Sequence, residues 1–520
     1  MTSPSQTPVM RMRARNVVRG AWVGLVTAAS AIGAAQLVAG ILGPQTSPIV
    51  TVGQAAIDLT PEGVKAFAIK TFGEQDKTVL LAGMAVVLAL VAVGLGVASL
   101  DRPRVGMGAL ALLGAIGLAA AWTRPGADAT DAVPAVAGTL AGAAILTVLR
   151  GIDGAGPVTT TAVERGPLLG RRSLMFGAMA AIAGTAAGGV GALLARRSRA
   201  DGSRAGVTVP APASRAAPAT DAELAVPGLA PFFTPNPRFY RVDTALLVPA
   251  VMAEDWRLRI HGMVDREIDL DFRQLLATPL IERDITLTCV ANSVGGGYVG
   301  NARWIGAPLR PLLEEAGVHP GVDQIVTRSV DGFTVGTPTV VVMDGRDAML
   351  AVAMNGEPLP LAHGFPVRML VPGLYGYVSA TKWLTDMELT TFDAFDPYWV
   401  RRGWAERAPI KTMARIDTPT PSMDVPAGEV PVAGVAWAQH VGIDRVEVRF
   451  GDGPWQDAQL AGEASLDTWR QWVHRWTATP GEHRIQVRAI DRTGSVQTAE
   501  RAEPFPDGAT GYHTIVVRVT

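Results

Sequence analysis

Residues 285–297, Ile-Thr-Leu-Thr-Cys-Val-Ala-Asn-Ser-Val-Gly-Gly-Gly, include the single cysteine of a chain of 520 residues. The apolar first half predicts a buried strand, and the closing glycines predict flexible backbone directly after it. A strand that ends in this way brings Cys289 to the edge of a sheet beside space for a large ligand. Its thiolate would suit a nucleophile or a soft metal ligand, although a lone strand cysteine is more often a small buried apolar residue.

Two later segments combine glycine, proline and single polar residues. One runs from Asn355 to Arg368 and contains His363, and the other runs from Val371 to Trp383 and contains Lys382. A histidine and an arginine five residues apart on a rigid loop, with a lysine nearby, suit a ligand that carries a phosphate and ring nitrogens. Either segment alone is typical of a solvated loop, but together with Cys289 they predict a binding site.

The residues around these motifs, 231–412, mix short strands with short helices, which predicts an α+β domain. The domain lacks the glycine-rich first turn of a dinucleotide-binding fold. Strands are predicted at Trp256–Ile260, Ile285–Val290, Val340–Met343 and Val367–Val371, and helical turns at Asp271–Leu276 and at Pro311–Glu315, ending near Gly317.

Residues 413–520 predict an all-β domain. Apolar and polar residues alternate at Val446–Phe450, before a turn at Gly451–Gly453, and again at Ile485–Ala489 and Thr514–Val519. Roughly seven short strands in about 100 residues predict an immunoglobulin-like sandwich, here without a disulfide.

Residues 1–196 predict an all-α membrane domain. Five uncharged apolar segments are each close to the roughly 20 residues that cross a bilayer as a helix: 21–42, 78–100, 105–123, 132–149 and 173–195. A short helix on the membrane surface is predicted at 60–73, and residues 197–230, rich in alanine and proline, predict an exposed linker.

Composition excludes several classes of function. A formal net charge of −1 argues against nucleic-acid binding, and a single cysteine excludes an intrachain disulfide, an iron–sulfur cluster and a c-type haem motif. The first histidine is His261, so the predicted spans carry no histidine pair for a membrane haem. None of the spans has an ionisable residue at its middle, which favours an anchor over a transporter.

The direction of insertion depends on basic residues at the ends of the spans. A small excess of arginine and lysine puts the N-terminus inside, and Gly170-Arg171-Arg172-Ser173 resembles a twin-arginine export signal. An ordinary basic helix flank is the alternative. These features predict a multi-pass protein of the cell membrane whose soluble domains are extracytoplasmic.

In their order along the chain, the motifs resemble the sulfite-oxidase family of molybdopterin-dependent oxidoreductases. The resemblance covers about residues 232–520, because the C-terminal sandwich is similar to that family's dimerisation domain for molybdenum-cofactor enzymes, which makes a homodimer an option. It rests on Thr288-Cys289, Ala302-Arg303-Trp304-Ile305-Gly306, Asn355-Gly356-Glu357-Pro358-Leu359, His363-Gly364-Phe365-Pro366-Val367-Arg368, and Gly376 through Lys382-Trp383.

The resemblance implies a molybdenum–molybdopterin cofactor with Cys289 as the thiolate ligand of the metal. It implies oxygen-atom transfer on a small oxyanion or an S- or N-oxide, in either redox direction, with electrons exchanged with an external carrier or a quinone. Arg303 and Tyr298 join Cys289 as candidate catalytic residues. Residues implied to bind the cofactor are Asn236, Tyr240, Arg241, His363, Arg368, Gly376, Ser379 and Lys382.

The chain departs from the family directly after the cysteine. Members that oxidise sulfite have arginines there, whereas this chain has the uncharged stretch Asn292–Gly297. Arg303, Arg241, Arg401 and Arg402 are candidates to replace those arginines, and either Tyr298 or Tyr375 is expected to line the substrate pocket.

A second hypothesis is a cell-envelope binding or adhesion module that keeps an enzyme-like fold. The C-terminal domain is rich in tryptophan, and these rings would serve either as an interaction face or, as we expect, as sandwich core and dimer contact. The residues are Trp437, Trp455, Trp469, Trp472 and Trp476.

Overall fold

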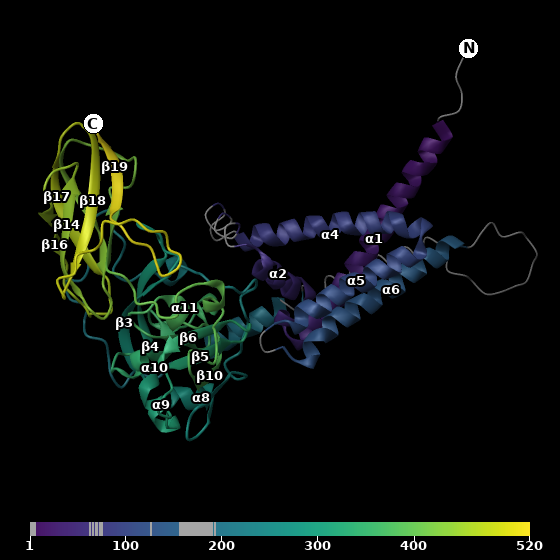
Figure 1. The fold of residues 1–520 in the computed structure, drawn as a ribbon, viewed down its shortest axis with the longest axis horizontal. Helices are drawn as coiled ribbons and strands as arrows, with labels where there is room; N and C mark the ends of the chain where they lie inside the picture. The colour runs from purple at the N-terminus through teal and green to yellow at the C-terminus, as the bar shows by residue number, and fades with distance from the viewer. Residues whose placement is uncertain are drawn as a thin grey trace, which may run out of the picture. The chain divides into compact units, whose positions relative to one another are not determined.

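The computed structural model describes residues 7–61, 64, 67, 71, 76–124, 127–154, 191 and 194–520. The chain divides into two compact units (Figure 1). The first comprises Met1–Arg199 with Thr244–Pro249, and the second comprises Ala200–Asp243 with Ala250–Thr520.

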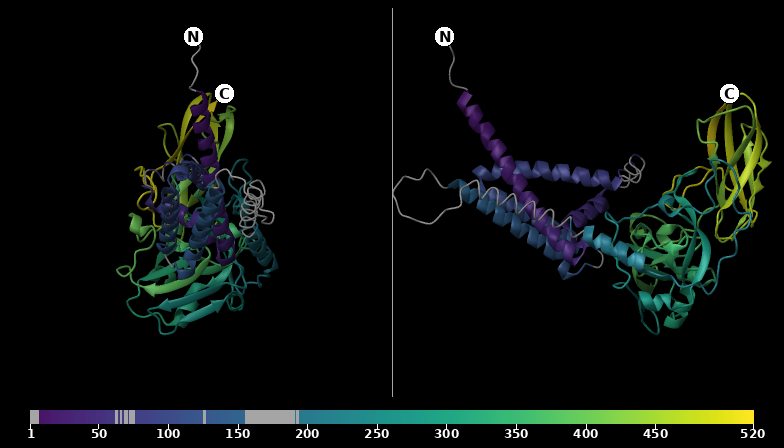
Figure 2. Two further views of the ribbon diagram at one scale, coloured as in Figure 1. Left: turned by 90° about the vertical axis from the view of Figure 1, so that its right-hand side faces the viewer. Right: turned by 180° about the vertical axis from the view of Figure 1, so that it is seen from behind.

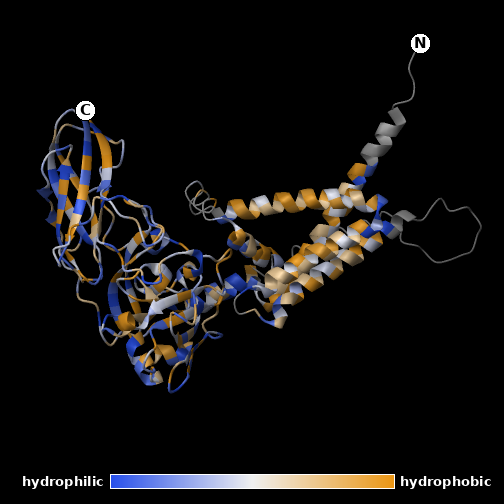
Figure 3. Ribbon diagram, viewed as in Figure 1, coloured by the Kyte–Doolittle hydropathy of each residue, from blue (hydrophilic) through white to orange (hydrophobic). Residues whose placement is uncertain are grey.

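Long apolar helices make up the first unit. Four of them are long and apolar enough to cross a membrane, over Asn16–Leu42, Lys77–Asp101, Pro103–Trp122 and Ala129–Arg150, and their apolar character is visible in Figure 3. They occupy the first four predicted segments. The fifth, 173–195, and the arginine pair before it lie outside the described residues. The helices are α1 (Thr7–Leu42), α2 (Pro48–Leu59), α4 (Asp76–Asp101), α5 (Pro103–Trp122) and α6 (Val133–Gly154), with short turns η1 (Pro44–Thr46) and η3 (Ala129–Ala132).

The helix α2 was not expected from the sequence. It begins with Pro48 at its first position and has 12 residues, too few to span a bilayer, so a search for spans passes over it. Most of the surface helix predicted at 60–73 lies outside the described residues, and the described positions 64, 67 and 71 are helical.

Glycine allows the apolar helices to approach closely. A side chain at Gly24 would collide with the backbone of Ala92, and one at Gly96 would collide with the backbone of Gly20. A side chain at Gly138 would likewise meet the backbone of α1. These contacts require small residues, as is typical of helices that pack within lipid.

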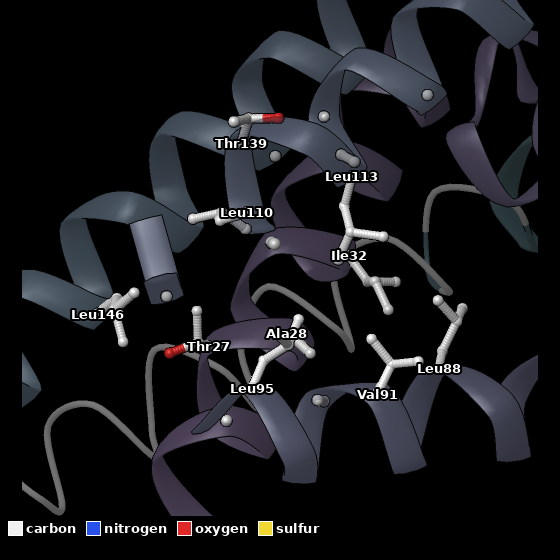
Figure 4. Close-up of a pocket in the computed structure, with 18 of the residues that line it drawn as sticks. Thr27, Ala28, Ile32, Leu88, Val91, Leu95, Leu110, Leu113, Thr139 and Leu146 are labelled. Carbon is white, nitrogen blue, oxygen red and sulfur yellow. The ribbon is translucent and has the colours of Figure 1, made fainter. Parts of the chain in front are cut away.

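A cavity of about 170 Å³ lies among α1, α4, α5 and α6 (Figure 4). Glycine, alanine and aliphatic side chains form most of its lining, and Thr27 and Thr139 are among its few polar residues. Every lining residue is uncharged, so this cavity offers no titratable group.

The second unit contains two five-stranded sheets before residue 412, flanked by short helices, in agreement with the predicted α+β pattern. The first sheet has the order β2 (Ile268–Asp271), β1 (Arg257–Gly262), β10 (Leu384–Thr390), β5 (Gln324–Ser329), β6 (Thr334–Pro338). The second has the order β3 (Ile281–Thr288), β4 (Val299–Pro308), β7 (Met349–Met354), β8 (Glu357–Pro358), with β9 (Arg368–Leu370) also on β7. The helices and turns are η4 (Asn236–Arg238), α8 (Phe272–Leu276), α9 (Leu309–Ala316), α10 (Thr339–Met343), η5 (Leu361–His363), α11 (Gly376–Ser379) and η6 (Val400–Arg402).

Most local predictions in this region hold, with one clear error. Asp271 caps α8 in a capping box with Gln274, and Gly317 ends α9 in a left-handed conformation. The strand predicted at Val340–Met343 is instead the helix α10, which follows Pro338. A short β-branched run does not by itself distinguish a strand from one helical turn.

Residues 413–520 form two further sheets, stacked face to face about one apolar core (Figure 2). Trp472 and Trp476 lie in this core, and Trp437 and Trp469 in a second cluster that includes Phe232. Four of the five tryptophans are therefore buried rather than displayed. One sheet has the order β11 (Met413–Thr418), β13 (Gly428–Trp437), β17 (Arg470–Ala478), β16 (Gln459–Leu460), and the other β12 (Asp424–Val425), β19 (His513–Val519), β18 (Gly481–Asp491), β14 (Ile443–Phe450), β15 (Gln456–Asp457).

Residues 197–230, predicted as an exposed linker, are helical at first and then extended. Residues 194–206 are helical, and the extended residues after them are bonded to the rest of the second unit. The amide of Ala213 donates to Leu280 O (2.8 Å), and the Gln471 side chain binds the backbone of Leu224 and Ala230. An extended proline-rich chain has no internal hydrogen bonds, so its backbone groups are satisfied by neighbouring strands and side chains.

Candidate functional site

Cys289 lies directly after β3, at the end of the ladder that β3 forms with β4. Its amide donates to Tyr298 O (2.9 Å), and its own carbonyl accepts from the amide of Asn292 (3.0 Å). The loop 289–298 therefore leaves and returns at adjacent positions, with the cysteine at its base. The cysteine is partly buried, and burial raises the pKa of its thiol to about 11, against a smaller lowering by the Lys382 charge.

Arg368, on β9, carries a buried guanidinium that is only 5% exposed. One of its amino groups donates to His363 O (3.2 Å), and the guanidinium lies 5.2 Å from the centre of the Trp304 ring. Within the described residues its Nε has no hydrogen-bond partner and no carboxylate forms an ion pair with it. Burial lowers the pKa of Arg368 to about 10, so the group is charged at neutral pH.

His363, the last residue of η5, is buried and neutral. Its Nε2 lies 3.2 Å from Asn236 O, and since a carbonyl only accepts, this nitrogen carries the proton. Burial, with smaller contributions from the charges of Arg368 and Lys382, lowers the pKa of His363 to about 4. Its Nδ1 is therefore left as an acceptor.

A carboxylate that the sequence did not single out connects two of the predicted cations. Asp243 Oδ2 accepts from Lys382 Nζ and from Arg241 Nε, each at 2.8 Å. Burial lowers the pKa of Lys382 to about 8, although Asp243 acts in the opposite direction. Asp243 lies two residues after Arg241, and that spacing is its only signal in the sequence.

Asn236 holds together the segments on either side of the site. Its side-chain amide donates to Met354 O (3.2 Å) and to Glu357 Oε1 (2.5 Å), and its Oδ1 accepts from Asn355 Nδ2 (2.9 Å). Glu357 in turn pairs with Arg204, at 2.7 Å. Sequence reasoning missed Arg204 because it was assigned to a linker.

Three tyrosines lie near the cysteine, and burial keeps the hydroxyls of Tyr240 and Tyr375 protonated. Burial raises the pKa of Tyr240 far above its usual range, and the Cys289 and Arg368 charges also act on it. The Tyr240 and Tyr298 rings lie 6.2 Å apart. Burial raises the pKa of Tyr375 to about 12, with a smaller contribution from Cys289.

The helix α11 lies beside the same strand end. A side chain at Gly376, the first residue of α11, would be 3.8 Å from Thr288 O. The Ser379 hydroxyl is fully buried and donates to the carbonyl of Leu374 (2.9 Å) and Tyr375 (3.0 Å). Ser379 thus holds the turn before α11 in place.

The Arg303 side chain is bound elsewhere than the cluster formed by Cys289, Arg368, His363 and Lys382. It lies opposite Asp284 on the β3–β4 ladder and makes two bonds to its carboxylate, at 2.7 and 2.9 Å. Asp284 precedes Cys289 by five residues, or roughly 16 Å along an extended strand. Arg402 packs against Tyr398, and Arg401 lies 5.9 Å from the Phe395 ring.

The cluster offers a defined set of chemical groups. It contains three cations: Arg241 and Lys382 share the carboxylate of Asp243, whereas Arg368 pairs with no carboxylate among the described residues. A neutral histidine, protonated phenols and a single thiol complete the set. Such a set suits an extended anionic ligand with ring nitrogens and a thiolate-binding metal.

Comparison with known proteins agrees with this chemistry. Residues 245–399 match the family model described as an oxidoreductase molybdopterin binding domain. The chain is 30% identical to mitochondrial sulfite oxidase of Drosophila melanogaster over 349 residues, which cover 55% of this chain and 60% of that protein. It is 28% identical to the human mitochondrial sulfite oxidase over 51% of this chain and 57% of that protein.

Two further relatives extend the comparison. An uncharacterized oxidoreductase of Bacillus subtilis, YuiH, is 32% identical over 152 residues, or 29% of this chain and 73% of that protein. The solved sulfane dehydrogenase SoxCD from Paracoccus pantotrophus is 25% identical, covers 57% of this chain and 85% of its own, and has a TM-score of 0.49. The chain spans about three-fifths of the length of the curated sulfite oxidases.

Proposed function

Because the chain belongs to the sulfite-oxidase family of molybdopterin-dependent oxidoreductases, we propose that it is a membrane-anchored enzyme with its molybdenum cofactor at Cys289. The molybdenum cofactor itself follows from family membership. The observation that carries its assignment to this site is Arg368, a buried cation without a carboxylate partner among the described residues. Tyr240 connects it to the thiol, because the charges of both Arg368 and Cys289 act on the Tyr240 hydroxyl.

The residues present fit such a group. A buried cation is costly unless an anion compensates it, and the phosphate of a pterin cofactor is an anion that the chain itself does not supply. A thiolate is a soft ligand that suits a sulfur-rich metal centre. When bound, the cofactor supplies oxygen-atom transfer and a two-electron redox change.

The chain's own groups would bind and orient that cofactor. Arg368 and Lys382 would provide charge for the phosphate, and Arg241 would add to it. The neutral His363 would accept a hydrogen bond at Nδ1, which fits a pterin N–H donor. Four further residues would shape the cofactor site, mainly by fixing the backbone around it: Asn236, Tyr240, Gly376 and Ser379.

Cys289 would bind the metal as a thiolate. The thiol pKa of about 11 means that the proton stays on sulfur in the cofactor-free chain, so loading releases one proton at neutral pH. The nearby cations would stabilise the negative charge that replaces it.

We further propose a small oxyanion or an S- or N-oxide as substrate. Tyr298, directly across the strand pair from Cys289, and Tyr240 are the candidates to donate hydrogen bonds to its oxygen. Arg303 is not proposed as a catalytic residue, because Asp284 occupies its guanidinium.

The apolar helices would anchor the enzyme, with the soluble domains outside the cytoplasm and the C-terminal sheets as an immunoglobulin-like dimerisation module. Electrons would pass to or from an external carrier or a quinone. The family match at residues 245–399 favours this enzyme over an adhesion module.

The test is the molybdenum and pterin content of purified full-length protein from a host that makes the cofactor. Wild-type protein is expected to contain both, and Cys289→Ser to lose most of its molybdenum. Metal-free wild-type protein, from a host that loads another member of the family, would refute the proposal.

A further inference from the structure

The strand that leads to Cys289 is an edge strand. β3 comes first in its sheet and pairs on its inner side with β4 along its whole length, from Ile281 to Thr288. Its other side would expose a row of backbone groups at every second residue. How that outer side is satisfied determines how firmly the end of β3, and with it Cys289, is held.

Every second residue on the outer side of β3 has a partner from a distant part of the chain. Ala213 and Ser214 bind the backbone of Leu280 and Glu282. The remaining bonds come from the C-terminal sheets: the Ser465 hydroxyl donates to Asp284 O (3.3 Å), and the amide of Thr286 donates to Asp467 O (2.9 Å).

Gln439 makes the last of these contacts before the cysteine. Its Nε2 donates to Thr286 O and to the Thr288 hydroxyl, each at 3.2 Å. The side chain comes from the loop between β13 and β14 and is 4% exposed. Thr288 is the residue next to Cys289, so no other contact of this series lies as close to the thiol.

Neighbouring contacts hold the Gln439 loop in place. The next residue, His440, has a φ of +63°, its amide donates to Leu466 O (3.0 Å), and its ring lies 3.3 Å from the Asp467 carboxylate. Asp467 is also the residue that binds Thr286. The two C-terminal loops therefore contact each other, and both bind Thr286 of β3.

We propose that Gln439 is a positioning residue for Cys289, through which the C-terminal sheets fix the end of β3 and the direction of the thiol. The inference rests on the proposed role of Cys289 in binding the cofactor. Gln439 does not touch the reacting atoms in this account. It acts through Thr286 and Thr288.

The test uses the fact that Cys289 is the single cysteine of the chain, so alkylation of cofactor-free full-length protein reports on this thiol alone. Gln439→Met keeps the length of the side chain and removes both donors. Two lost hydrogen bonds are expected to ease opening of the strand end and to accelerate alkylation about tenfold. In the loaded protein, the sulfur-to-metal absorption band is expected to shift.

Gln497→Met is the matched control. Gln497 is also buried in the C-terminal sheets and binds backbone groups, but those of Ala414, Ala489 and Gly511 rather than β3. This variant is expected to lower thermal stability without changing the alkylation rate. If Gln439→Met fails to fold, Thr288→Val removes one of the two acceptors and is expected to accelerate alkylation by about threefold to fivefold.

Two results would overturn the inference: a wild-type alkylation rate in Gln439→Met or Thr288→Val, or equal acceleration in Gln497→Met. Neither would affect the proposed function, which instead fails if wild-type protein lacks molybdenum.

Discussion

Two arginines of one sheet show how differently the same side chain is used. Arg303, on β4, meets Asp284 in a two-bonded ion pair, and Glu282 lies 3.9 Å away. Arg368, on β9, is more deeply buried, and its one bond is to a backbone carbonyl, His363 O. Both strands belong to the sheet that contains β7.

The difference separates structure from function. A cation whose charge is matched within the protein is part of the fold, and its removal leaves a partner uncompensated. A buried cation without such a match destabilises the free protein, so its retention points to an anion from outside the chain. The resemblance to a known family did not distinguish the two arginines. The ion pair of Arg303 with Asp284 does, because Arg368 has no such pair among the described residues.

The largest effect on stability is expected at the matched arginine. Arg303→Met leaves the Asp284 carboxylate, which is 3% exposed, without its cation. We expect the cofactor-free protein to lose about 4 kcal/mol of unfolding free energy. Denaturant unfolding of the second unit, followed by tryptophan fluorescence, measures this loss. A loss below about 1 kcal/mol would contradict the structural role of Arg303.

Asp243→Asn extends the comparison to the carboxylate within the cluster. The buried Lys382 ammonium would lose its partner, so we expect the cofactor-free protein to lose about 3 kcal/mol. Cofactor phosphate would supply replacement charge, and the loss should be smaller in loaded protein. Unfolding midpoints of both forms check this. Equal losses of unfolding free energy with and without cofactor would show that Lys382 does not bind the phosphate.

A pH titration compares His363, which is buried, with His513, which is partly buried. The pKa of His363 is lowered to about 4 by burial and nearby cations, and that of His513 is lowered to about 4 by burial and Arg415. Below the ordinary histidine pKa of about 6.5, the unfolded chain binds a proton that the folded chain does not bind. Each histidine should therefore lower the free energy of unfolding by up to about 3 kcal/mol as the pH falls from 6.5 to 4.

Single replacements distinguish the two. His363→Gln and His513→Gln should each flatten the acid dependence of stability in cofactor-free protein. An anionic cofactor beside His363 would raise its pKa, so loading should flatten the acid dependence further at that residue alone. If loading instead changes the contribution of His513, the cofactor does not lie beside His363.

Much of the site was visible in the sequence because the residues come in compact local motifs. His363 and Arg368 share one loop, and Gly376 and Lys382 share another, so their short spacing already implied proximity. Asp243 and Arg204 were missed because each acts through a partner more than a hundred positions away. The pairing of Arg303 with Asp284 was not visible in the sequence, because only the register of β3 against β4 reveals it.

The fold shows the same division. Four apolar helices, the end of α9 at Gly317 and most alternating strands lie close to where local patterns predicted them. The hydrogen bonds of the extended segment after residue 206 could not be predicted, because its partners, such as Gln471, are remote in sequence. Long-range hydrogen bonds leave no local pattern.

The smallest effect is expected at an exposed ion pair. Arg259 and Glu267 lie 2.8 Å apart, and both side chains are more than half exposed. Arg259→Met should change the unfolding free energy by less than about 1 kcal/mol, because solvent screens such pairs. A larger loss in the same denaturant experiment would show that the effect of Arg303→Met does not depend on burial of its partner.

The most direct test of the central claim is the molybdenum and pterin content per folded chain of Arg368→Met beside Arg303→Met, each purified from a cofactor-competent host. Arg368→Met should lose at least about tenfold in loading while its cofactor-free form stays as stable as wild type, since a charged hydrogen bond to the ligand is lost and an uncompensated charge is removed. Arg303→Met should be less stable, yet its folded fraction should load normally. Normal loading of Arg368→Met, or equal loss in both variants, would contradict the account.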